Sequence, residues 1–389
     1  MRELTLRELD VVESFGALGI QVALQELTKT GREKSIMDAV FSIRELLSSN
    51  GLHDYSAQGQ GREHKVILSA HWLAANEIGE VEVSLYRPTT KKGDPRIWIK
   101  GLKGESADYD VLAFWVVEER LWTCNLSHIS RMNGSRERLL DLFQKESEGQ
   151  LSQVAEELLS KLRVIAQRGW IQSLRTGDTG IGYTLETELG IPANSSKTPD
   201  YKGIEIKSYR ANRGNRKNLF AKVANWKASK LKSSAEVLSH FGYERDGVLK
   251  LYCTISSKVY NSQGLRLVVD SEDGCLYETS DQEDLSRFLT WRLDDLKSSL
   301  LQKHKETFWV KAESRKIEGF EEFRYLSVTH TRKPLVNNLP FAIEQGVVTL
   351  DHLIKKGSRG VSEKGPLFKM KEGHEDILFP QQVEHSLLI

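Results

Sequence analysis

Four residues near the middle of the chain, Glu186, Asp200, Glu205 and Lys207, have types and a spacing that could support chemistry. Carboxylates crowded within a few ångströms repel one another unless a cation lies between them, and oxygen ligands without His or Cys favour Mg²⁺ over Zn²⁺. A lysine ammonium beside them can orient an attacking water and offset the negative charge that develops on a phosphoryl group. The cluster therefore predicts a divalent-metal site suited to phosphodiester hydrolysis.

The first element that must position this cluster is a short helix. Residues 179–189 favour a helix that begins after Asp178 or Thr179 as the N-cap and ends at Gly190. Glu186 lies near the end of that helix, so we expect its carboxylate close to the residues that follow.

The second element is a strand, "GIEIKS", over residues 203–208. Because side chains alternate along a strand, Ile204 and Ile206 would face the core while Glu205 and Lys207 project together from the other face. Asp200 would lie where this strand begins. A surface strand carrying an ordinary ion pair is the alternative interpretation of the same pattern.

A basic segment follows the cluster. No Asp or Glu occurs between Ile206 and Ala235, whereas Tyr209, Phe220 and Trp226 are interleaved with nine basic residues, Lys207, Arg210, Arg213, Arg216, Lys217, Lys222, Lys227, Lys230 and Lys232. Solvated helices usually mix charges of both signs. This segregation predicts a surface that binds a polyanion, since each contact neutralises a phosphate and releases counterions.

Composition limits the other possibilities. With 39% hydrophobic and 28% charged residues the 389-residue chain is typical of a globular protein, and its net charge of +1 means that any DNA affinity must come from local patches. The three cysteines are far apart and have no zinc-type spacing. The amino terminus is charged, and no apolar run approaches the length of a bilayer span. We predict a soluble, cytoplasmic protein that does not contact a membrane.

The pattern before residue 149 differs from the rest of the chain. Residues 4–27 and 34–49 have helical spacing, and the second helix would begin at Ser35 and end at Asn50. An alternating strand pattern in "EVEVSLY" follows, and then "VLAFWVVEERLWTCNL", which predicts two apolar strands around a short charged turn. Between them, residues 87–104 contain six basic residues and one acid. These residues form either a solvated hairpin face or a phosphate-contacting surface in which Lys92, Arg96 and Lys100 bind DNA.

Residues 135–168 return to helical periodicity, and the polar stretch "ESEGQ" at residues 146–150 interrupts it. This break predicts a boundary between two domains. We predict an accessory domain over 1–148, of α+β type with a β-rich core, and a second domain over 149–389.

The sequence "TGIGYTLETELGI" followed by "KTPDYKGIEIKS" resembles the catalytic core of the MvaI/BcnI family of restriction endonucleases, relatives of the repair nickase MutH. The resemblance extends over most of residues 165–389. It implies a PD-(D/E)XK fold of α/β (α+β) class with a mixed central sheet. It also implies that Asp200 and Glu205 bind the metal, that Lys207 is the catalytic lysine, and that Glu186 completes the acidic site as a third ligand.

The resemblance extends to later segments that would complete a DNA cleft, "FWVKAESRK", "HTRKP" and "GPLFKMK". Arg and His can donate to base acceptors in the grooves of DNA. The candidate DNA contacts outside the accessory domain are Arg210, Arg213, Arg216, Lys217, Lys311, Arg315, His330, Arg332 and Lys369.

The resulting hypothesis is a Mg²⁺-dependent, sequence-specific endonuclease for double-stranded DNA that leaves 5′-phosphate and 3′-hydroxyl ends. The family resemblance implies a monomer that nicks the two strands in succession. The segments "KVILSAHW" and "VSLYR" resemble the effector domain of EcoRII-type enzymes, so the accessory domain could bind a second DNA copy or sense a modified base. A MutH-like or modification-dependent nuclease and a non-catalytic DNA-binding scaffold are the alternatives.

Overall fold

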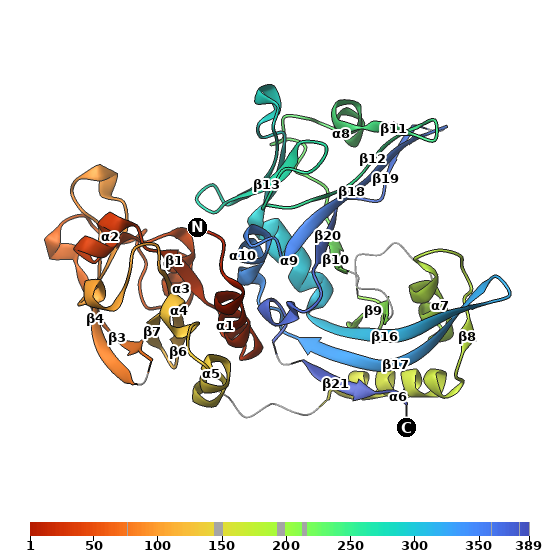
Figure 1. Cartoon of the computed structure of the whole chain (residues 1–389), viewed down its shortest axis with the longest axis horizontal. Helices are drawn as coiled ribbons and strands as arrows, with labels where there is room; N and C mark the ends of the chain where they lie inside the picture. Colours follow the sequence, from red (N-terminus) through yellow and green to blue (C-terminus); the bar gives the residue numbers. More distant parts are fainter. Residues whose placement is uncertain are drawn as a thin grey trace. The chain divides into compact units, whose positions relative to one another are not determined.

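The chain divides into two compact units, Met1–Lys145 (unit 1) and Glu146–Ile389 (unit 2). The computed structural model (Figure 1) describes residues 1–75, 77–143, 151–192, 199–211, 216–358, 360–380 and 382–388. The predicted domain boundary after residue 148 falls outside these described residues.

Unit 1 combines short helices with one sheet. Its helices are α1 (Leu6–Ala17), α2 (Lys29–Lys34), α3 (Phe41–Ser49), α4 (Leu126–Ile129) and α5 (Ser135–Phe143). Its strands are β1 (Ala23–Glu26), β2 (Ile36–Asp38), β3 (Val66–Leu73), β4 (Ile78–Tyr86), β5 (Arg96–Ile99), β6 (Val111–Val117) and β7 (Arg120–Asn125).

The strand order in unit 1 is β1-β6-β7-β3-β4-β5-β2, with β3 and β7 parallel and the other neighbours antiparallel. The predicted pair of strands around a charged turn is confirmed by β6 and β7. Glu118 and Glu119 form that turn with φ of 52° and 60°, as a tight hairpin with right-handed strand twist requires. One face of the sheet packs on α3 through a buried cluster that includes Leu46, Val83 and Ile97.

The two predicted amino-terminal helices are only partly correct. Helix α1 ends at Ala17, because Gly19 with φ of 71° turns the chain into β1, which pairs with β6. The second prediction placed a helix start at Ser35, but Ser35 is the left-handed C-cap of α2 and leads into β2. Helix α3 begins only at Phe41 and ends, as predicted, before Asn50.

Unit 2 contains longer strands. Its helices are α6 (Gln153–Gln167), α7 (Gly180–Glu188), α8 (Ser234–Phe241), α9 (Leu293–His304) and α10 (Leu339–Glu344). Its strands are β8 (Ile171–Gln172), β9 (Glu205–Arg210), β10 (Lys217–Ala221), β11 (Tyr243–Arg245), β12 (Val248–Ile255), β13 (Leu265–Asp270), β14 (Cys275–Ser280), β15 (Leu289–Arg292), β16 (Glu306–Ile317), β17 (Phe320–Arg332), β18 (Val348–Gly357), β19 (Gly360–Glu363), β20 (Leu367–Met370) and β21 (Val383–Ser386).

The sheet that carries the predicted cluster has the order β21-β17-β16-β9, with β8 also paired to β17. Strand β9 runs parallel to β16, whereas β16, β17 and β21 are antiparallel neighbours. The predicted mixed sheet is therefore confirmed. A second sheet has the order β10-β20-β18-β12-β11, with β19 on β18, and β13, β14 and β15 form a third.

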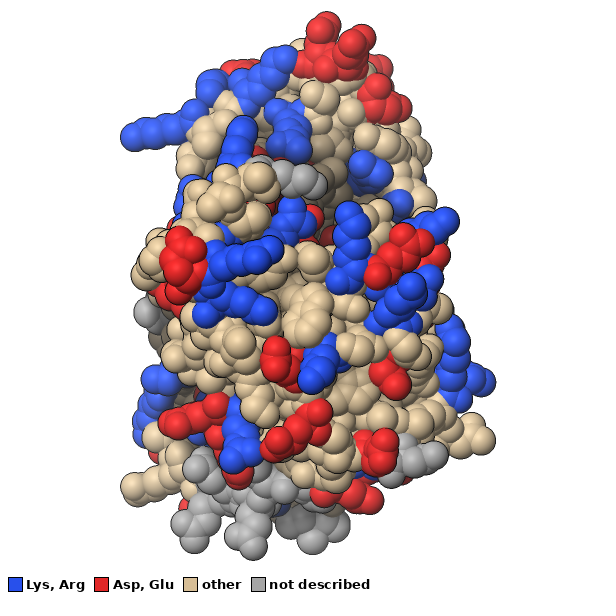
Figure 2. Space-filling view, turned by 90° about the vertical axis from the view of Figure 1, so that its left-hand side faces the viewer, with Lys and Arg blue, Asp and Glu red and all other residues tan. Residues whose placement is uncertain are grey.

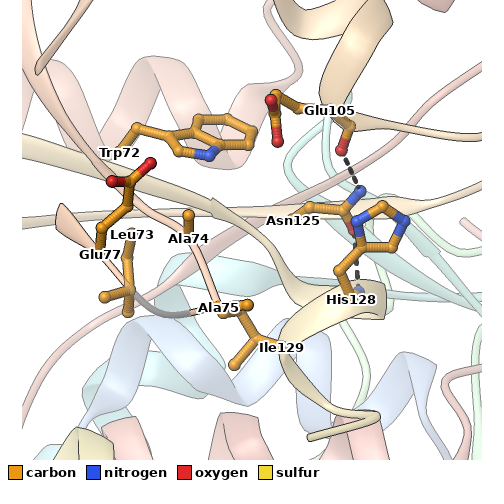
Figure 3. Close-up of a pocket in the computed structure, with 9 residues that line it drawn as sticks. All are labelled: Trp72, Leu73, Ala74, Ala75, Glu77, Glu105, Asn125, His128 and Ile129. Carbon is orange, nitrogen blue, oxygen red and sulfur yellow. Dashed lines mark hydrogen bonds between the residues drawn. The ribbon is translucent and has the colours of Figure 1, made fainter. Parts of the chain in front are cut away.

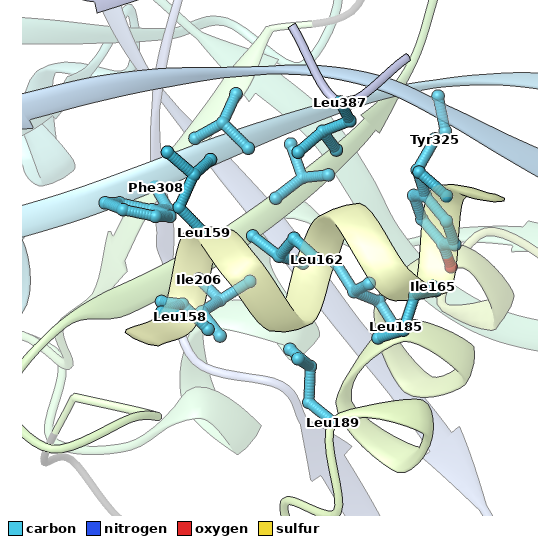
Figure 4. Packing of buried hydrophobic residues seen from close by; sticks show 14 of the residues in the cluster. Leu158, Leu159, Leu162, Ile165, Leu185, Leu189, Ile206, Phe308, Tyr325 and Leu387 are labelled. Carbon is cyan, nitrogen blue, oxygen red and sulfur yellow. The ribbon is translucent and has the colours of Figure 1, made fainter. Parts of the chain in front are cut away.

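Helix α6 covers the core of the first sheet (Figure 4). Leu158, Leu162 and Ile165 recur at helical spacing and are buried against Ile206 of β9 and Phe308 of β16. Ser152 caps the helix by accepting a hydrogen bond from the backbone N–H of Ala155. This packing fixes the β9 side chains that face away from the core.

None of the helices in the described parts of the chain is long and apolar enough to cross a membrane.

Candidate active site

Strand β9 and helix α7 place the four predicted residues in one region. The predicted helix is confirmed by α7, which follows Thr179 and ends before Gly190, whose φ is 72°. The predicted alternation is confirmed as well: Ile206 is 4% exposed in the core, and Glu205 and Lys207 contact each other on the opposite face. Asp200 lies before the strand and accepts a hydrogen bond from the backbone N–H of Ile206 at 3.0 Å.

Glu205 is the most deeply buried member of this cluster. Its side chain is fully buried, and Lys207 Nζ donates to its Oε1. Lys303 Nζ, from the last turn of α9, lies 3.3 Å from its Oε2. Two ammonium groups thus neutralise one buried carboxylate, while each lysine side chain stays 22–27% exposed. Such partners offset the cost of burying a charge.

Glu186 responds to the other carboxylates. Burial raises the pKa of Glu186, and the negative charges of Asp200 and Glu205 raise it further, while Lys207 and Arg175 act in the opposite direction. Like charges close enough to shift a pKa compete for protons or for a cation. The structure therefore brings Glu186, Asp200, Glu205 and Lys207 into one electrostatic unit.

The fit of this cluster to Mg²⁺ can be tested on its donor atoms. Within the described residues, no three Asp, Glu, His or Cys side chains lie close enough together to form a metal cage. Mg²⁺ does not need a cage, because it commonly uses one or two protein carboxylates and fills the remaining positions with water and phosphate oxygens. Asp200 and Glu205 fit that requirement. Glu186, the third predicted ligand, is coupled to them electrostatically.

The face of the sheet that carries the cluster continues from β9 onto β16. In the parallel register, Thr307, Trp309 and Lys311 pair with Glu205, Lys207 and Tyr209, respectively. Since paired residues project from the same face, the partly exposed Lys311 lies on the same side as the acidic cluster. This position is suited to a phosphate contact.

Two other predicted DNA contacts, Arg216 and Lys369, meet at the second sheet. Arg216 makes a bidentate pair with Asp351 at 2.6 and 3.0 Å, and Lys369 Nζ lies 2.9 Å from the same carboxylate. Burial acts to raise the pKa of Asp351, but hydrogen bonds from Arg216 and Lys369 outweigh it and lower the pKa. The side chains of both cations remain partly exposed.

Arg210 and His330 are buried. The Arg210 guanidinium is bidentate to Glu321 at 2.8 and 2.9 Å and also donates to the carbonyl oxygens of Gly177 and Asp178. Arg210 thereby holds the turn before α7 in place. His330 Nε2 lies 2.9 Å from Glu306 Oε1, and the residue is 2% exposed. These positions leave Arg210 and His330 outside a solvent-facing DNA surface.

Three further predicted residues of unit 2 lie on strands. Lys217 Nζ is 2.7 Å from Glu375 Oε1 and is mostly buried. Arg315 is exposed, pairs with Glu322 at 2.7 Å and has its guanidinium 4.1 Å from the ring of Trp170. Arg332, at the end of β17, is partly exposed. Of the three, Arg315 is the most accessible to DNA.

The basic residues predicted in unit 1 lie in and around β5. Lys92 and Lys100 are exposed, and Arg96 pairs with Asp38 of β2. Arg213, in the basic segment of unit 2, lies outside the described residues.

Lys303 is a site residue that sequence reasoning missed. It precedes β16 by three residues, and the pairing of Thr307 with Glu205 brings the end of α9 to the cluster. The neighbouring His304 is fully buried, donates through Nε2 to the Leu219 carbonyl oxygen at 2.8 Å and contacts Thr307 Oγ1 at 3.0 Å. Burial lowers the pKa of His304 to about 3, and Lys207 and Lys303 contribute. Nothing in the local sequence marks Lys303, because its partner is 98 residues away.

Unit 2 is similar to known proteins. Residues 159–379, more than half of the chain, match the model of the MvaI/BcnI restriction endonuclease family, and the four clustered residues lie within that range. The solved structure "Restriction endonuclease MvaI-cognate DNA substrate complex" is similar with a TM-score of 0.54 and 21% identity, covering 61% of this chain and 100% of that chain. The likeness confirms the predicted PD-(D/E)XK fold.

A second solved structure, "Restriction endonuclease MvaI in the absence of DNA", has a TM-score of 0.37 and 20% identity and covers 60% of this chain and 98% of that chain. No curated protein matches the chain.

Proposed function

The chain belongs to the MvaI/BcnI restriction endonuclease family, and from this premise we propose that it is a Mg²⁺-dependent, sequence-specific endonuclease for double-stranded DNA. The observation that carries the proposal is the buried Glu205, which is paired with two partly exposed lysines and lies next to Asp200 and Glu186. A purely structural ion pair has no need for the additional carboxylates, because each of them adds repulsion.

In the proposed reaction, water attacks phosphorus in line and the bond to the 3′-oxygen breaks. The 3′-oxygen takes up a proton, which leaves 5′-phosphate and 3′-hydroxyl ends. Asp200 and Glu205 would hold Mg²⁺, which when bound supplies positive charge to the reacting phosphate. Lys207 orients the attacking water and donates to a phosphate oxygen as its charge grows.

Lys303 has a related role in the proposal. In the structure its ammonium shares Glu205 with Lys207. With DNA bound, the Lys303 ammonium could turn toward a phosphate, since its four-carbon stem is flexible. Lys311, on the same face of the sheet, would contact a neighbouring phosphate.

We further propose that the protein acts as a cytoplasmic monomer that nicks the two strands in succession, and that unit 1 is an accessory DNA-binding domain. The solved relative with TM-score 0.54 is described as a complex with its DNA substrate. If unit 1 binds a second DNA copy, adding short duplexes that contain the target sequence should change the rate at which a single-site plasmid is cut. An unchanged rate would reject this gating role.

The direct test of the proposal compares Lys207→Ala with the parent on supercoiled plasmid in Mg²⁺. We expect loss of cleavage by about a thousandfold or more, as for removal of a group that stabilises the transition state. Lys161→Ala, the same change at an exposed position of α6, is the matched control and should cut like the parent. Equal rates for Lys207→Ala and the parent would contradict the assignment. Run-off sequencing of the ends would report the site and distinguish nicking from cleavage of both strands.

A further inference from the structure

Unit 1 contains a cavity of about 660 Å³ that borders the open face of its sheet. We call it the Trp98 pocket and define it by Arg62, Lys65, Tyr86, Arg87 and Trp98. Its size lies within the range of about 300–1,000 Å³ typical of small-ligand sites. The family match begins at residue 159, so it assigns no role to this pocket.

The pocket has two aromatic walls. In the antiparallel register, Trp98 of β5 pairs with Ser84 of β4, and Tyr86 pairs with Arg96. Because side chains alternate, Tyr86 and Trp98 stand on one face, while Leu85 and Ile97 point to the opposite face and are fully buried in the core. Both aromatic residues are only partly buried, so their rings are accessible for stacking.

The charge of the pocket is predominantly positive. Arg62 and Lys65 are exposed at its rim, and Lys65 Nζ lies 5.5 Å from the centroid of the Trp98 ring. The Arg87 guanidinium donates to the carbonyl oxygens of Gly93, Gln58 and Tyr55, at 2.8, 3.1 and 3.4 Å. Since these acceptors are neutral, they hold Arg87 in place without cancelling its charge.

One acidic residue, Glu63, also lines the pocket. Its side chain is 70% exposed, and its Oε1 lies 3.8 Å from His64 Nε2. Figure 2 looks onto the side on which β3 and β4 lie in Figure 1, and shows Lys and Arg side chains around an uncharged area, with carboxylates among them. An aromatic surface bordered by cations suits a planar ring that carries phosphate.

Another cavity of unit 1 has the opposite character (Figure 3). It measures about 420 Å³ and is lined by the acids Glu77 and Glu105, together with Trp72 and His128. His128 lies 3.3 Å from Asp110 Oδ2. These carboxylates would repel a phosphate. The two cavities of unit 1 thus differ in the charge of their lining residues.

We propose that the Trp98 pocket binds one nucleobase of DNA. The base stacks on Trp98 and Tyr86, and its neighbouring phosphates are held by Arg62 and Lys65 in the positive field of Arg87. Stacking on aromatic side chains tolerates any base because every base has a π-face, whereas the phosphate contacts depend on salt. The base can come from a single strand or can be displaced from a duplex, and both sources present the same chemistry. The choice of DNA as the ligand rests on the proposed DNA-binding role of unit 1. Base binding needs no catalysis, so a failure of this proposal can be told apart from a failure of the nuclease assignment.

The test measures binding of the full-length chain to fluorescein-labelled oligonucleotides in EDTA, by fluorescence anisotropy. A twelve-residue thymidine oligonucleotide is compared with an abasic oligonucleotide of the same length, which keeps the phosphates and lacks the bases. We expect the parent to prefer the base-bearing strand by about tenfold or more. Trp98→Leu should reduce this preference to about twofold or less, and Lys65→Gln should weaken binding to both strands equally.

Trp72→Leu is the matched control, because it makes the same change in the acidic cavity of Figure 3 and should leave the preference intact. A folded Trp98→Leu that keeps the full preference would overturn the proposal. A measurement on the parent covers the case in which Trp98→Leu does not fold. Under photocrosslinking, an oligonucleotide that contains 5-iododeoxyuridine should attach to the peptide that contains Tyr86 or the peptide that contains Trp98. Crosslinks found solely in other peptides would also overturn the proposal.

Two further arms distinguish the source of the base. Preference for a duplex with one unpaired thymidine over a fully paired duplex, lost in Trp98→Leu, would identify a base displaced from a duplex. If only the single strands show a Trp98-dependent preference for base-bearing over abasic DNA, the base comes from single-stranded DNA. Either result supports the pocket as a base-binding site.

Discussion

Each unit of the protein contains a buried glutamate that is paired with cations. In unit 1, Glu8 is 2% exposed and accepts hydrogen bonds from Arg2 at 2.6 and 2.8 Å, from Ser127, and from the backbone N–H of Thr5. In unit 2, Glu205 is fully buried and is paired with Lys207 and Lys303. Burial and ion pairing are thus common to both.

The surroundings of the two glutamates differ. Glu8 completes the capping box of α1, and every contact on it favours its charge. Glu205 lies beside Asp200 and Glu186; burial raises the pKa of Glu186, and the negative charges of Asp200 and Glu205 raise it further. Burial and pairing alone therefore do not separate the two glutamates; the additional like charge around Glu205 does, and the proposed catalytic role of Glu205 rests on that difference.

The largest expected effect is that of Glu205→Gln on cleavage. Because the variant keeps the shape of the side chain and removes its charge, we expect plasmid cleavage in Mg²⁺ to fall by about a thousandfold. Unfolding free energy should change by less than about 1 kcal/mol, since Lys207 and Lys303 both reach solvent and the crowding of carboxylates is relieved. A large loss of stability without loss of cleavage would make Glu205 a structural residue like Glu8.

The next effect concerns Lys303. Lys303→Met keeps the length of the side chain and removes the ammonium, and we expect single-turnover cleavage to slow by about ten- to a hundredfold. Lys303→Arg keeps the positive charge and should retain more activity than Lys303→Met. Equal rates for the parent and Lys303→Met would limit the role of Lys303 to neutralising Glu205 in the absence of DNA.

In unit 1 the expectation is reversed. Glu8→Gln should lower the free energy of unfolding of unit 1 by about 2 kcal/mol, because it breaks a buried pair with Arg2 and weakens the cap of α1. Denaturant titration followed by a probe in unit 1 measures this loss. Cleavage by the folded variant should stay within about twofold of the parent. A parallel loss of activity and stability would erase the distinction between the two glutamates.

The smallest effect is the dependence of this stability on pH. Burial acts to raise the pKa of Glu8, but hydrogen bonds from Arg2 and Ser127 outweigh it and lower the pKa from 4.5 to about 2. The folded state therefore gains stability from Glu8 above pH 4.5 and loses it as the pH falls toward 2. The difference in unfolding free energy between the parent and Glu8→Gln should shrink over that interval. A difference that stays constant down to pH 2 would contradict the assignment.

The sequence predicted what depends on local patterns. The alternation of side chains along a strand predicted that Glu205 and Lys207 share one face of β9, and Gly190 predicted where α7 ends. The strand β1 was missed because its apolar residues continue the helical spacing of α1, and only its pairing with β6 shows that it is extended. Pairing across the chain is a tertiary effect that local propensity does not contain.

Charge segregation was visible in the sequence, but the partners of the charges were not. Arg216 and Arg210 belong to one basic segment, yet the first meets Asp351 on the second sheet and the second is buried on Glu321. Lys303 joins the site through β16. These contacts connect residues about a hundred or more positions apart, and no spacing in a single sequence encodes them.

The most direct test of the central claim, that Asp200 and Glu205 form a metal-dependent nuclease centre with Lys207, is the cleavage rate of Asp200→Asn. Asparagine keeps an oxygen for the hydrogen bond from Ile206 N–H and loses only the charge. In saturating Mg²⁺ the account predicts that this variant leaves supercoiled plasmid uncut under conditions in which the parent cuts it completely. Cleavage by Asp200→Asn at the parent's rate would contradict it.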